Sequence, residues 1–438
     1  MKPAILCALV LAGALSSLAY ADVTLLRAGR VITDPREAPL GATTIVVRDG
    51  RIVALAPGRA AAPPADLKPD ERVTEIDLGE HTVLPGLIDS HVHLASQYGV
   101  PWWQDAVRTA EYDVAVGLYN AGITLRAGFT TVRDLGSEPR VMFAVRDAIR
   151  DGLAAGPRIL ASGPAISITG GHGDVNGFRP EVVQALSGEN TCSGADQCAQ
   201  RVREASRNGA DLIKVTVTGG VLSQQNRGFD QHFTDAELGA IVGTARLLGL
   251  KTAAHAHGAR GVEAAAKAGF DSIEHAVFAD EAALKALRAS GAYLVPTLST
   301  TNAYRERIGT GFYTPQVEAK ARQRLAETGK SIVAAKKLGV KIAFGTDLGV
   351  YRHGTNAGEI PLLVKYAGFT PREALVSATV SAADLLGLAS EIGTLAPGKS
   401  ADIIAVEGDP LEDATAMTRV RFVMARGGIV TNTTGATQ

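Results

Sequence analysis

The chain has 438 residues, of which 46% are hydrophobic and 20% are charged, and its formal net charge is −1. This length allows one large domain and a small one, with a sizeable buried core. The near-neutral charge and the lack of any Lys/Arg run argue against nucleic acid or an anionic membrane surface as the partner.

The first 21 residues have the composition of a secretory signal peptide. Lys2 supplies the positive start, residues 4–19 form the apolar stretch, and Ala19-Tyr20-Ala21 is a small-x-small cleavage site. We expect cleavage after Ala21 and a periplasmic or secreted mature chain without membrane contact. An uncleaved membrane anchor is the alternative, but the apolar run is short for a membrane span.

Residues 22–81 contain short β-like runs. Apolar residues recur over 23–32 and 43–56, and the second run is interrupted at Arg48-Asp49-Gly50. Asp-Gly between two apolar runs is typical of a hairpin turn. Residues 57–69 are rich in Ala and Pro and are expected to form a loop. The segment is predicted to be the N-terminal part of a β domain.

From residue 82 to 389, short apolar runs alternate with longer amphipathic segments. Eight runs have the character of strands, at 82–89, 130–135, 158–163, 212–217, 251–256, 271–276, 292–297 and 341–346. Several of the helix-like stretches between them end in glycine, which commonly terminates helices. Strands alternating with helices predict a parallel sheet, and eight such units predict a (β/α)₈ TIM barrel. A doubly wound open sheet is the alternative.

Two cysteines, Cys192 and Cys198, lie close together within this segment. A close pair in an exported protein can form a disulfide, and the residues between them can turn. A zinc role would need further ligands nearby, and the sequence shows none. We expect a disulfide, with two free thiols as the alternative.

After residue 389 the pattern returns to β. The segments 393–409 and 420–432 have the alternation of strands and hairpins. We expect residues 390–438 to pair with residues 22–81 in one small β-sandwich-like domain beside the barrel.

Metal-capable side chains occur at the ends of the predicted barrel strands, and they are His91, His93, Lys214, His255, His275 and Asp347. Side chains alternate along a strand, so His-x-His places two imidazoles on one face, where they suit one divalent metal. A lone histidine is more often a hydrogen-bonded structural residue. Three separate histidine sites at strand ends, where TIM barrels carry their active sites, favour a metal centre.

Lys214 lies in the apolar run ADLIKVTV, where an ammonium is costly to bury. A snorkelling or ion-paired lysine is the structural alternative. Burial would lower its pKa and leave a nucleophilic amine, which can react with carbon dioxide to give an anionic carbamate able to bridge two cations. Asp347 ends the eighth run, where a carboxylate can bind metal and accept a proton from water.

The motifs LPGLIDSHVHL, AGFTTVRDLG, HAHG, SIEHA, FGTD and GTLAPGKSADIIAVEGDP occur in this order, with the strand lysine among them. They resemble the amidohydrolase superfamily, and most of all its binuclear dipeptidases and carboxypeptidases, which include prolidase-like and ochratoxin-hydrolysing enzymes. The resemblance covers nearly everything after the signal peptide. It implies a barrel with a β-sandwich-like side domain and a site for two divalent metal ions, which the resemblance implies are Zn²⁺.

Carried over residue by residue, the resemblance implies two metal sites. The first would consist of His91, His93, carboxylated Lys214 and Asp347. The second would consist of the same Lys214 carbamate, His255 and His275. Two close metals lower the pKa of a bridging water and give hydroxide near neutral pH. Asp347 would accept its proton and pass it to the leaving amine.

Further residues are expected near the substrate. The resemblance suggests that His172, in the Gly-rich loop ITGGHGDVNG, faces the substrate and helps to polarise its carbonyl. The residues expected to line the pocket are His257, Ser96 and Tyr98. The groups expected to bind a substrate carboxylate are Arg227, His232 and His353. Each of these also has a reading as an ordinary loop residue.

The resemblance favours a zinc-dependent amidase or peptidase that cleaves the amide bond of a dipeptide or N-acyl amino acid and releases the C-terminal residue. Ochratoxin-like amides, in which an aromatic acyl group is joined to phenylalanine, fit this description. The alternatives are a lactonase or cyclic-amide hydrolase of the same superfamily and, more remotely, a non-catalytic binding protein. A one-metal deaminase is disfavoured, because a bridging lysine implies two metals. We expect a homo-oligomer acting on a small molecule.

Overall fold

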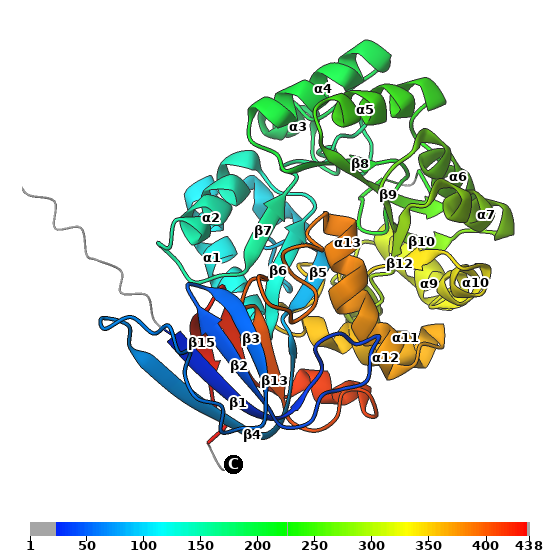
Figure 1. Ribbon diagram of the computed structural model, residues 1–438. Helices are drawn as coiled ribbons and strands as arrows, with labels where there is room; N and C mark the ends of the chain where they lie inside the picture. Colours follow the sequence, from blue (N-terminus) through cyan, green and yellow to red (C-terminus); the bar gives the residue numbers. More distant parts are fainter. Residues whose placement is uncertain (1–22, 226, 436–438) are drawn as a thin grey trace, which may run out of the picture.

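The computed structural model describes residues 23–225 and 227–435 (Figure 1). The predicted signal peptide lies outside these residues. Within them, no helix is both long and apolar enough to cross a membrane.

The two ends of the described chain meet in one seven-stranded sheet, in the order β15-β14-β13-β4-β1-β2-β3. Its strands are β1 (Val23–Val31), β2 (Thr43–Arg48), β3 (Arg51–Pro57), β4 (Val73–Pro85), β13 (Ile403–Val406), β14 (Val420–Ala425) and β15 (Gly428–Asn432). The sheet forms because β13 pairs antiparallel with the second half of β4. The predicted hairpin is β2–β3, and its turn residues Asp49 and Gly50 have φ of 51° and 75°, as Asp-Gly turns require.

The strand β13 buries both of its faces, but against different partners. Ile403 and Phe422 pack with Leu26 and Ile45 in a core of the sheet's own. Their neighbour Ile404 points the other way and joins the main core of the molecule. This alternation follows from the two-residue period of a strand, and it anchors the sheet to the barrel.

Eight barrel strands are present, but the first begins at Leu87 rather than at Thr82, because residues 82–85 end β4 and pair with β13 in the other sheet. The barrel strands are β5 (Leu87–Val92), β6 (Phe129–Asp134), β7 (Arg158–Ala161), β8 (Leu212–Thr216), β9 (Lys251–Gly258), β10 (Ser272–Phe278), β11 (Tyr293–Val295) and β12 (Lys341–Ile342). Every pairing among them is parallel, in the order β5-β6-β7 and β8-β9-β10-β11-β12. Parallel bridges from Ile166 to Val215 and from Val92 to Leu348 link the two groups on both sides. The strands are therefore arranged as a barrel rather than as an open sheet.

Helices surround these strands on the outside (Figure 1). They are α1 (Ala110–Arg126), α2 (Pro139–Arg150), α3 (Pro180–Leu186), α4 (Ala195–Arg207), α5 (Asp235–Leu247), α6 (Ala259–Ala268), α7 (Glu281–Ser290), α8 (Thr300–Arg307), α9 (Pro315–Ala326), α10 (Lys330–Leu338), α11 (Glu359–Ala367), α12 (Pro371–Val376) and α13 (Ala382–Leu386). The capping box of Thr234 and Glu237 starts α5, and Gly269 ends α6 in a left-handed conformation. Cys192 and Cys198 form a disulfide between the start of α4 and the loop before it.

Candidate metal centre

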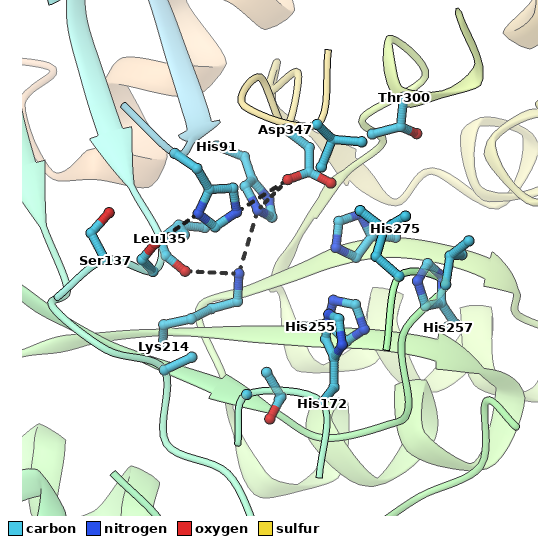
Figure 2. A pocket seen from close by; sticks show the side chains of 18 of the residues that line it. His91, Leu135, Ser137, His172, Lys214, His255, His257, His275, Thr300 and Asp347 are labelled. Atoms are coloured by element: carbon cyan, nitrogen blue, oxygen red, sulfur yellow. Dashed lines mark hydrogen bonds and ion pairs between the residues drawn. The ribbon is translucent and has the colours of Figure 1, made fainter. Parts of the chain in front are cut away.

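The six predicted metal ligands converge at the carboxyl ends of the barrel strands, and five of them, all except His93, are labelled in Figure 2. All six line one cavity of about 330 Å³. β5 carries His91, and His93 is the first residue after this strand. β8, β9 and β10 carry Lys214, His255 and His275. The loop after β12 carries Asp347. Residues far apart in sequence meet because parallel strands place equivalent ends together.

Asp347 connects the first histidine pair. Its Oδ1 lies 3.1 Å from Nε2 of His93 and 3.4 Å from Nε2 of His91. Burial acts to raise the pKa of Asp347, but the two neighbouring imidazoles outweigh it and hold the pKa below its usual value. Asp347 is therefore an anion in a buried site, and its carboxylate is suited to bind a cation.

In three of the histidines, the Nδ1 atom of the ring contacts a neighbouring group of the protein that fixes the ring orientation. Nδ1 of His91 lies 2.9 Å from the Glu274 carboxylate, and Nδ1 of His93 lies 2.9 Å from the Gly136 carbonyl. Nδ1 of His275 lies 2.7 Å from the Thr297 hydroxyl. These contacts leave the Nε2 atoms for the cavity, the arrangement usual for metal-binding histidines.

The protonation states also favour metal binding. Burial lowers the pKa of His91, His255 and His275 well below the ordinary value, and neighbouring positive groups add to this effect. Their imidazoles are therefore neutral and carry a free lone pair. The exception is His93, whose pKa is raised, because hydrogen bonding to Asp347 outweighs the opposing effect of burial.

Lys214 is 3% exposed and points into the same cavity. Its Nζ lies 3.4 Å from Nε2 of His91 and 3.3 Å from the Leu135 carbonyl, and no carboxylate of the described chain lies within ion-pair distance. Burial lowers its pKa to about 8. A snorkelling or ion-paired lysine is thus ruled out by its surroundings, and the neutral amine is within reach at mildly alkaline pH.

A buried ion pair supports the position of His91, and sequence patterns did not indicate it. Glu274 accepts a 3.0 Å hydrogen bond from Arg133 through Oε1 and contacts His91 through Oε2. Arg133 also donates to the Ser90 carbonyl and the Ser272 hydroxyl. Both side chains are at most 2% exposed, so this network locks the His91 ring in place.

His172, predicted to face the substrate, lies beside the metal-capable cluster. Its ring centroid is 4.4 Å from that of His255, and its Nδ1 is 2.5 Å from the Ser223 hydroxyl. Burial, with Lys214 next in effect, lowers its pKa to about 3. A neutral imidazole can polarise a carbonyl by donating one hydrogen bond, without bringing a second charge into the cavity.

Two cations on α9 face this site, and sequence patterns did not distinguish them from surface residues. Lys320 donates to the carbonyls of Gly220, Ser223 and Gln225 and so holds the loop that carries the partner of His172. Arg324 is 2% exposed and lines the metal cavity with Tyr304 and Thr300. In the described part of the chain, the Arg324 guanidinium has neither a hydrogen-bond partner nor an ion pair.

The sequence model of the amidohydrolase family matches residues 82–430, the segment that holds every ligand above. The chain is a member of the amidohydrolase family. An ochratoxinase from Aspergillus niger is 32% identical over 418 residues, which cover 90% of this chain and 83% of that protein. A Xaa-Pro dipeptidase crystallised with methionine in its active site is 37% identical with a TM-score of 0.85, covering 93% of this chain and 99% of that one. A prolidase in complex with N-methylphosphonate-L-proline is 31% identical with a TM-score of 0.83, covering 94% and 100%.

In this amidohydrolase the donor set fits divalent metal ions. Two overlapping groups place their ligand atoms within 4.8 Å of one another, and they are His91, His275 and Asp347, and His255, His257 and His275. His275 belongs to both groups, whereas the resemblance assigned it to one site. His257, predicted to face the substrate, is as close to His255 and His275 as a ligand would be.

The amidohydrolase cavity includes only part of the predicted substrate-binding set. His257 lines it, and Ser96 lines an adjoining cavity. Tyr98 lines neither, and its hydroxyl donates a 2.6 Å hydrogen bond to Glu306. His353 is bound to the Ser96 carbonyl instead of pointing inward.

Arg227 and His232 are likewise outside the two cavities. Arg227 is exposed, with its guanidinium next to Gly170, and both nitrogens of His232 are buried without a partner. Loop residues 10 or more positions beyond a strand are placed by packing that the strand pattern does not encode. The arginine that lines the metal cavity is Arg324 instead.

Proposed function

We propose that this amidohydrolase binds two zinc ions and hydrolyses the amide bond of dipeptides or N-acyl amino acids that carry a free carboxylate. The observation that carries the proposal is Arg324, a buried and unpaired guanidinium in the same cavity as the metal-capable cluster. A buried cation without a partner is costly, and a substrate carboxylate would remove that cost. Arginine is well suited to this, because its planar fork matches a carboxylate.

The proposed ligands are divided as the resemblance implies. One ion would be held by His91, His93 and Asp347, and the other by His255 and His275, with carboxylated Lys214 between them. The lowered pKa of Lys214 supports carboxylation, since only the neutral amine attacks carbon dioxide. Two such ions, when bound, activate water for attack and polarise the substrate carbonyl.

The remaining steps fall to side chains. Arg324 would bind the carboxylate and so fix the scissile amide over the ligands. His172 would donate from Nε2 to the carbonyl oxygen, because its Nδ1 is engaged with Ser223. Asp347 would take a proton at Oδ and deliver it to the leaving nitrogen. Its lowered pKa keeps it ionised and ready to accept.

We also propose a periplasmic or secreted location. The Cys192–Cys198 disulfide supports it, because disulfides persist in oxidising compartments.

The test compares N-acyl amino acids with their carboxamides, which lack the charge that Arg324 would bind. We expect kcat/KM to fall by roughly 30- to 150-fold on amidation, corresponding to about 2–3 kcal/mol for a charged hydrogen-bond pair. Arg324→Gln should lower activity on the acids and remove most of the difference between acids and amides.

The matched control is Arg322→Gln, which removes an exposed arginine of the same helix that pairs with Glu318. It should leave both rates unchanged. Faster cleavage of a lactone or cyclic-amide panel than of any carboxylate-bearing amide would overturn the proposal in favour of the alternative activity.

A further inference from the structure

A second cavity, of about 750 Å³, adjoins the metal cavity. The two share five lining residues, and these are His93, Gly136, Ser137, Leu222 and Val350. The cavity extends from there past the segment before α1, the end of α3 and the segment before α9. A molecule with one end at the metal ligands can therefore continue into this space.

Aromatic and aliphatic groups form much of its wall. Trp102, which lines the cavity, packs against Phe178 with tilted rings, at 4.6 Å between ring centroids. Phe312 and Tyr313 lie together at 5.4 Å, and Leu186 and Val317 add aliphatic surface. Such walls suit a bulky, flat apolar group, which gains by leaving water and by edge or face contacts with the rings.

The charged residues that line the second cavity carry an excess of positive charge. Three arginines, Arg108, Arg140 and Arg307, line it against two carboxylates. Asp113 is paired with Arg108 at 2.5 Å and Glu138 with Arg140 at 2.8 Å, and Glu138 also accepts the Val141 amide. Neither carboxylate is free to receive an ammonium group.

Arg307 has no such partner. Its guanidinium lies 3.6 Å from the ring centroid of Tyr98 and 3.9 Å from that of Phe312, and no carboxylate of the described chain is within ion-pair distance. The nearby Glu306 accepts bonds from Tyr98, Tyr351 and Arg352 instead. The cavity thus presents one uncompensated positive charge next to its aromatic wall.

The position of the cavity assigns it to one side of the scissile bond. Ser137 lies on one side of the metal ligands, and Thr300 and His257 lie on the other (Figure 2). Ser137 is shared with the second cavity, whereas Thr300 and Arg324 line the metal cavity alone. With the carboxylate at Arg324, the acyl group points toward Ser137 and the second cavity.

We infer that the second cavity is the acyl-side subsite and that it selects neutral or anionic aromatic acyl groups over groups with a free α-ammonium. A dipeptide would place its α-ammonium where the wall offers an unpaired arginine and no free carboxylate. The natural substrates are therefore N-blocked amino acids with a bulky aromatic acyl group rather than free dipeptides. The acyl assignment rests on the proposed amide hydrolysis, but the charge preference of the cavity does not.

Fluorescence tests the charge preference without any turnover. Trp102 and Trp103 are the two tryptophans of the chain, and Trp103 is exposed and lines neither cavity. Trp103→Phe leaves Trp102 as the sole reporter inside the subsite. The probes are N-methyl-3-phenylpropanamide and phenylalanine N-methylamide, which differ only in the α-ammonium, titrated at about pH 6.5 where that amine is protonated.

We expect the neutral amide to bind at least about tenfold more tightly, and Arg307→Gln to narrow this ratio. Arg203→Gln removes an exposed arginine of α4 and should leave the ratio unchanged. Equal or tighter binding of the ammonium probe would overturn the inference, and so would an unchanged ratio in Arg307→Gln.

A second arm compares hydrolysis of 3-phenylpropanoyl-glycine and phenylalanyl-glycine, which release the same amino acid. Faster cleavage of the former supports the inference, and faster cleavage of the dipeptide overturns it while leaving amide hydrolysis intact. If neither is cleaved but the fluorescence preference holds, the proposed function fails and the charge selectivity of the cavity stands.

Discussion

Asp347 and His275 reach the metal centre from backbone conformations that most residues avoid. Their φ angles are 60° and 73°, and that of Thr297, the partner of His275, is 55°. Such conformations cost about 1–3 kcal/mol each and persist only where the surroundings enforce them. At Asp347 the enforcing contact is its own amide, which donates to the His91 carbonyl at 2.7 Å. The strain thus lies at the residues whose side chains must turn inward.

The left-handed backbone at Asp347 makes Asp347→Asn a sharp test of its role. Asparagine tolerates this conformation, so the loop should keep its shape while the proton acceptor is lost. We expect turnover to fall by roughly 10²- to 10⁴-fold, the usual worth of a general base, with an unchanged circular dichroism spectrum.

Asp49→Asn is the matched control, because Asp49 also has positive φ but lies in the β2–β3 turn. It should retain full activity. Wild-type turnover in Asp347→Asn would rule out the assigned proton transfer.

The Thr297 hydroxyl is expected to set the metal affinity of His275. Thr297→Val removes the hydrogen-bond partner of Nδ1 while keeping the branched shape, and Thr297→Ser keeps the hydroxyl. Loss of such a partner typically weakens metal binding by about 10- to 100-fold. Competition with a chelator, read as bound zinc per chain, should show this loss in the valine variant and little change in the serine variant. Equal affinities in the two variants would assign Thr297 a packing role only.

Single residues were predictable where their chemistry conflicts with their surroundings. Lysine in an apolar strand and histidines at strand ends stand out, and all of them meet in the cavity. Arg324 and Glu274 do not stand out, because a buried arginine on an amphipathic helix and a glutamate beside a histidine look like surface residues. Their burial depends on which elements pack against them.

At the scale of elements, α11 is tied to the loop after β11 by its first residue. Glu359 is fully buried and accepts hydrogen bonds from the Leu298 amide and from the amide and hydroxyl of Ser299, at 2.6–2.7 Å. Burial outweighs these bonds and raises its pKa from 4.5 to about 8. The same loop carries Thr297 and leads into α8, so this carboxyl connects helix packing to one wall of the site.

This raised pKa predicts that Glu359 lowers stability as the pH rises. Between about pH 4.5 and 8 the folded protein holds a proton that the unfolded chain has released, so stability falls with increasing pH in that window. Glu359→Gln stays neutral throughout. The Tm of the variant should therefore rise relative to that of the wild type from pH 5 to pH 8, by thermal melts at fixed ionic strength.

Glu263→Gln removes a partly exposed carboxylate paired with Lys267 on α6 and serves as the control. A Tm difference for Glu359→Gln that stays constant or shrinks over the same pH range would contradict the assignment.

The types of the elements were predictable from the spacing of apolar residues and from the glycine and turn residues that end each segment, but the lengths of the elements were not. Seven of the eight strand-like runs each became one barrel strand, whereas the run 82–89 is divided between the end of β4 and the start of β5. Of the barrel strands, β12 has only two residues and β11 three. After these strands the chain leaves the ladder early to form the loops that carry Thr297 and Asp347. The functional demand on the strand end overrides the local preference of the sequence, which is why pattern reasoning extends these strands too far.

For the whole molecule, the decisive feature is that the seven-stranded sheet and the barrel share one core. Ile404 of β13 packs in the main cluster with Leu87 and Phe129 of the barrel, next to Gly128. The alternation of apolar and polar residues in the terminal segments predicted strands. Because both segments have this β-like pattern, they were predicted to form one domain. The register of β4 with β13 could not be predicted, because it depends on contacts between segments some 320 residues apart.

The shared core predicts that the sheet and the barrel unfold together. Ile404→Ala should cost about 2–5 kcal/mol, because it opens a cavity where the surrounding strands cannot collapse. In hydrogen exchange, the free energy of opening should fall by the same amount for the amides of β2 in the sheet and of β9 in the barrel. Leu247→Ala, at a side chain that is 87% exposed, should change neither by more than about 0.5 kcal/mol. Destabilisation of β2 alone, with β9 unaffected, would show instead that the sheet opens independently and that the metal centre does not depend on it.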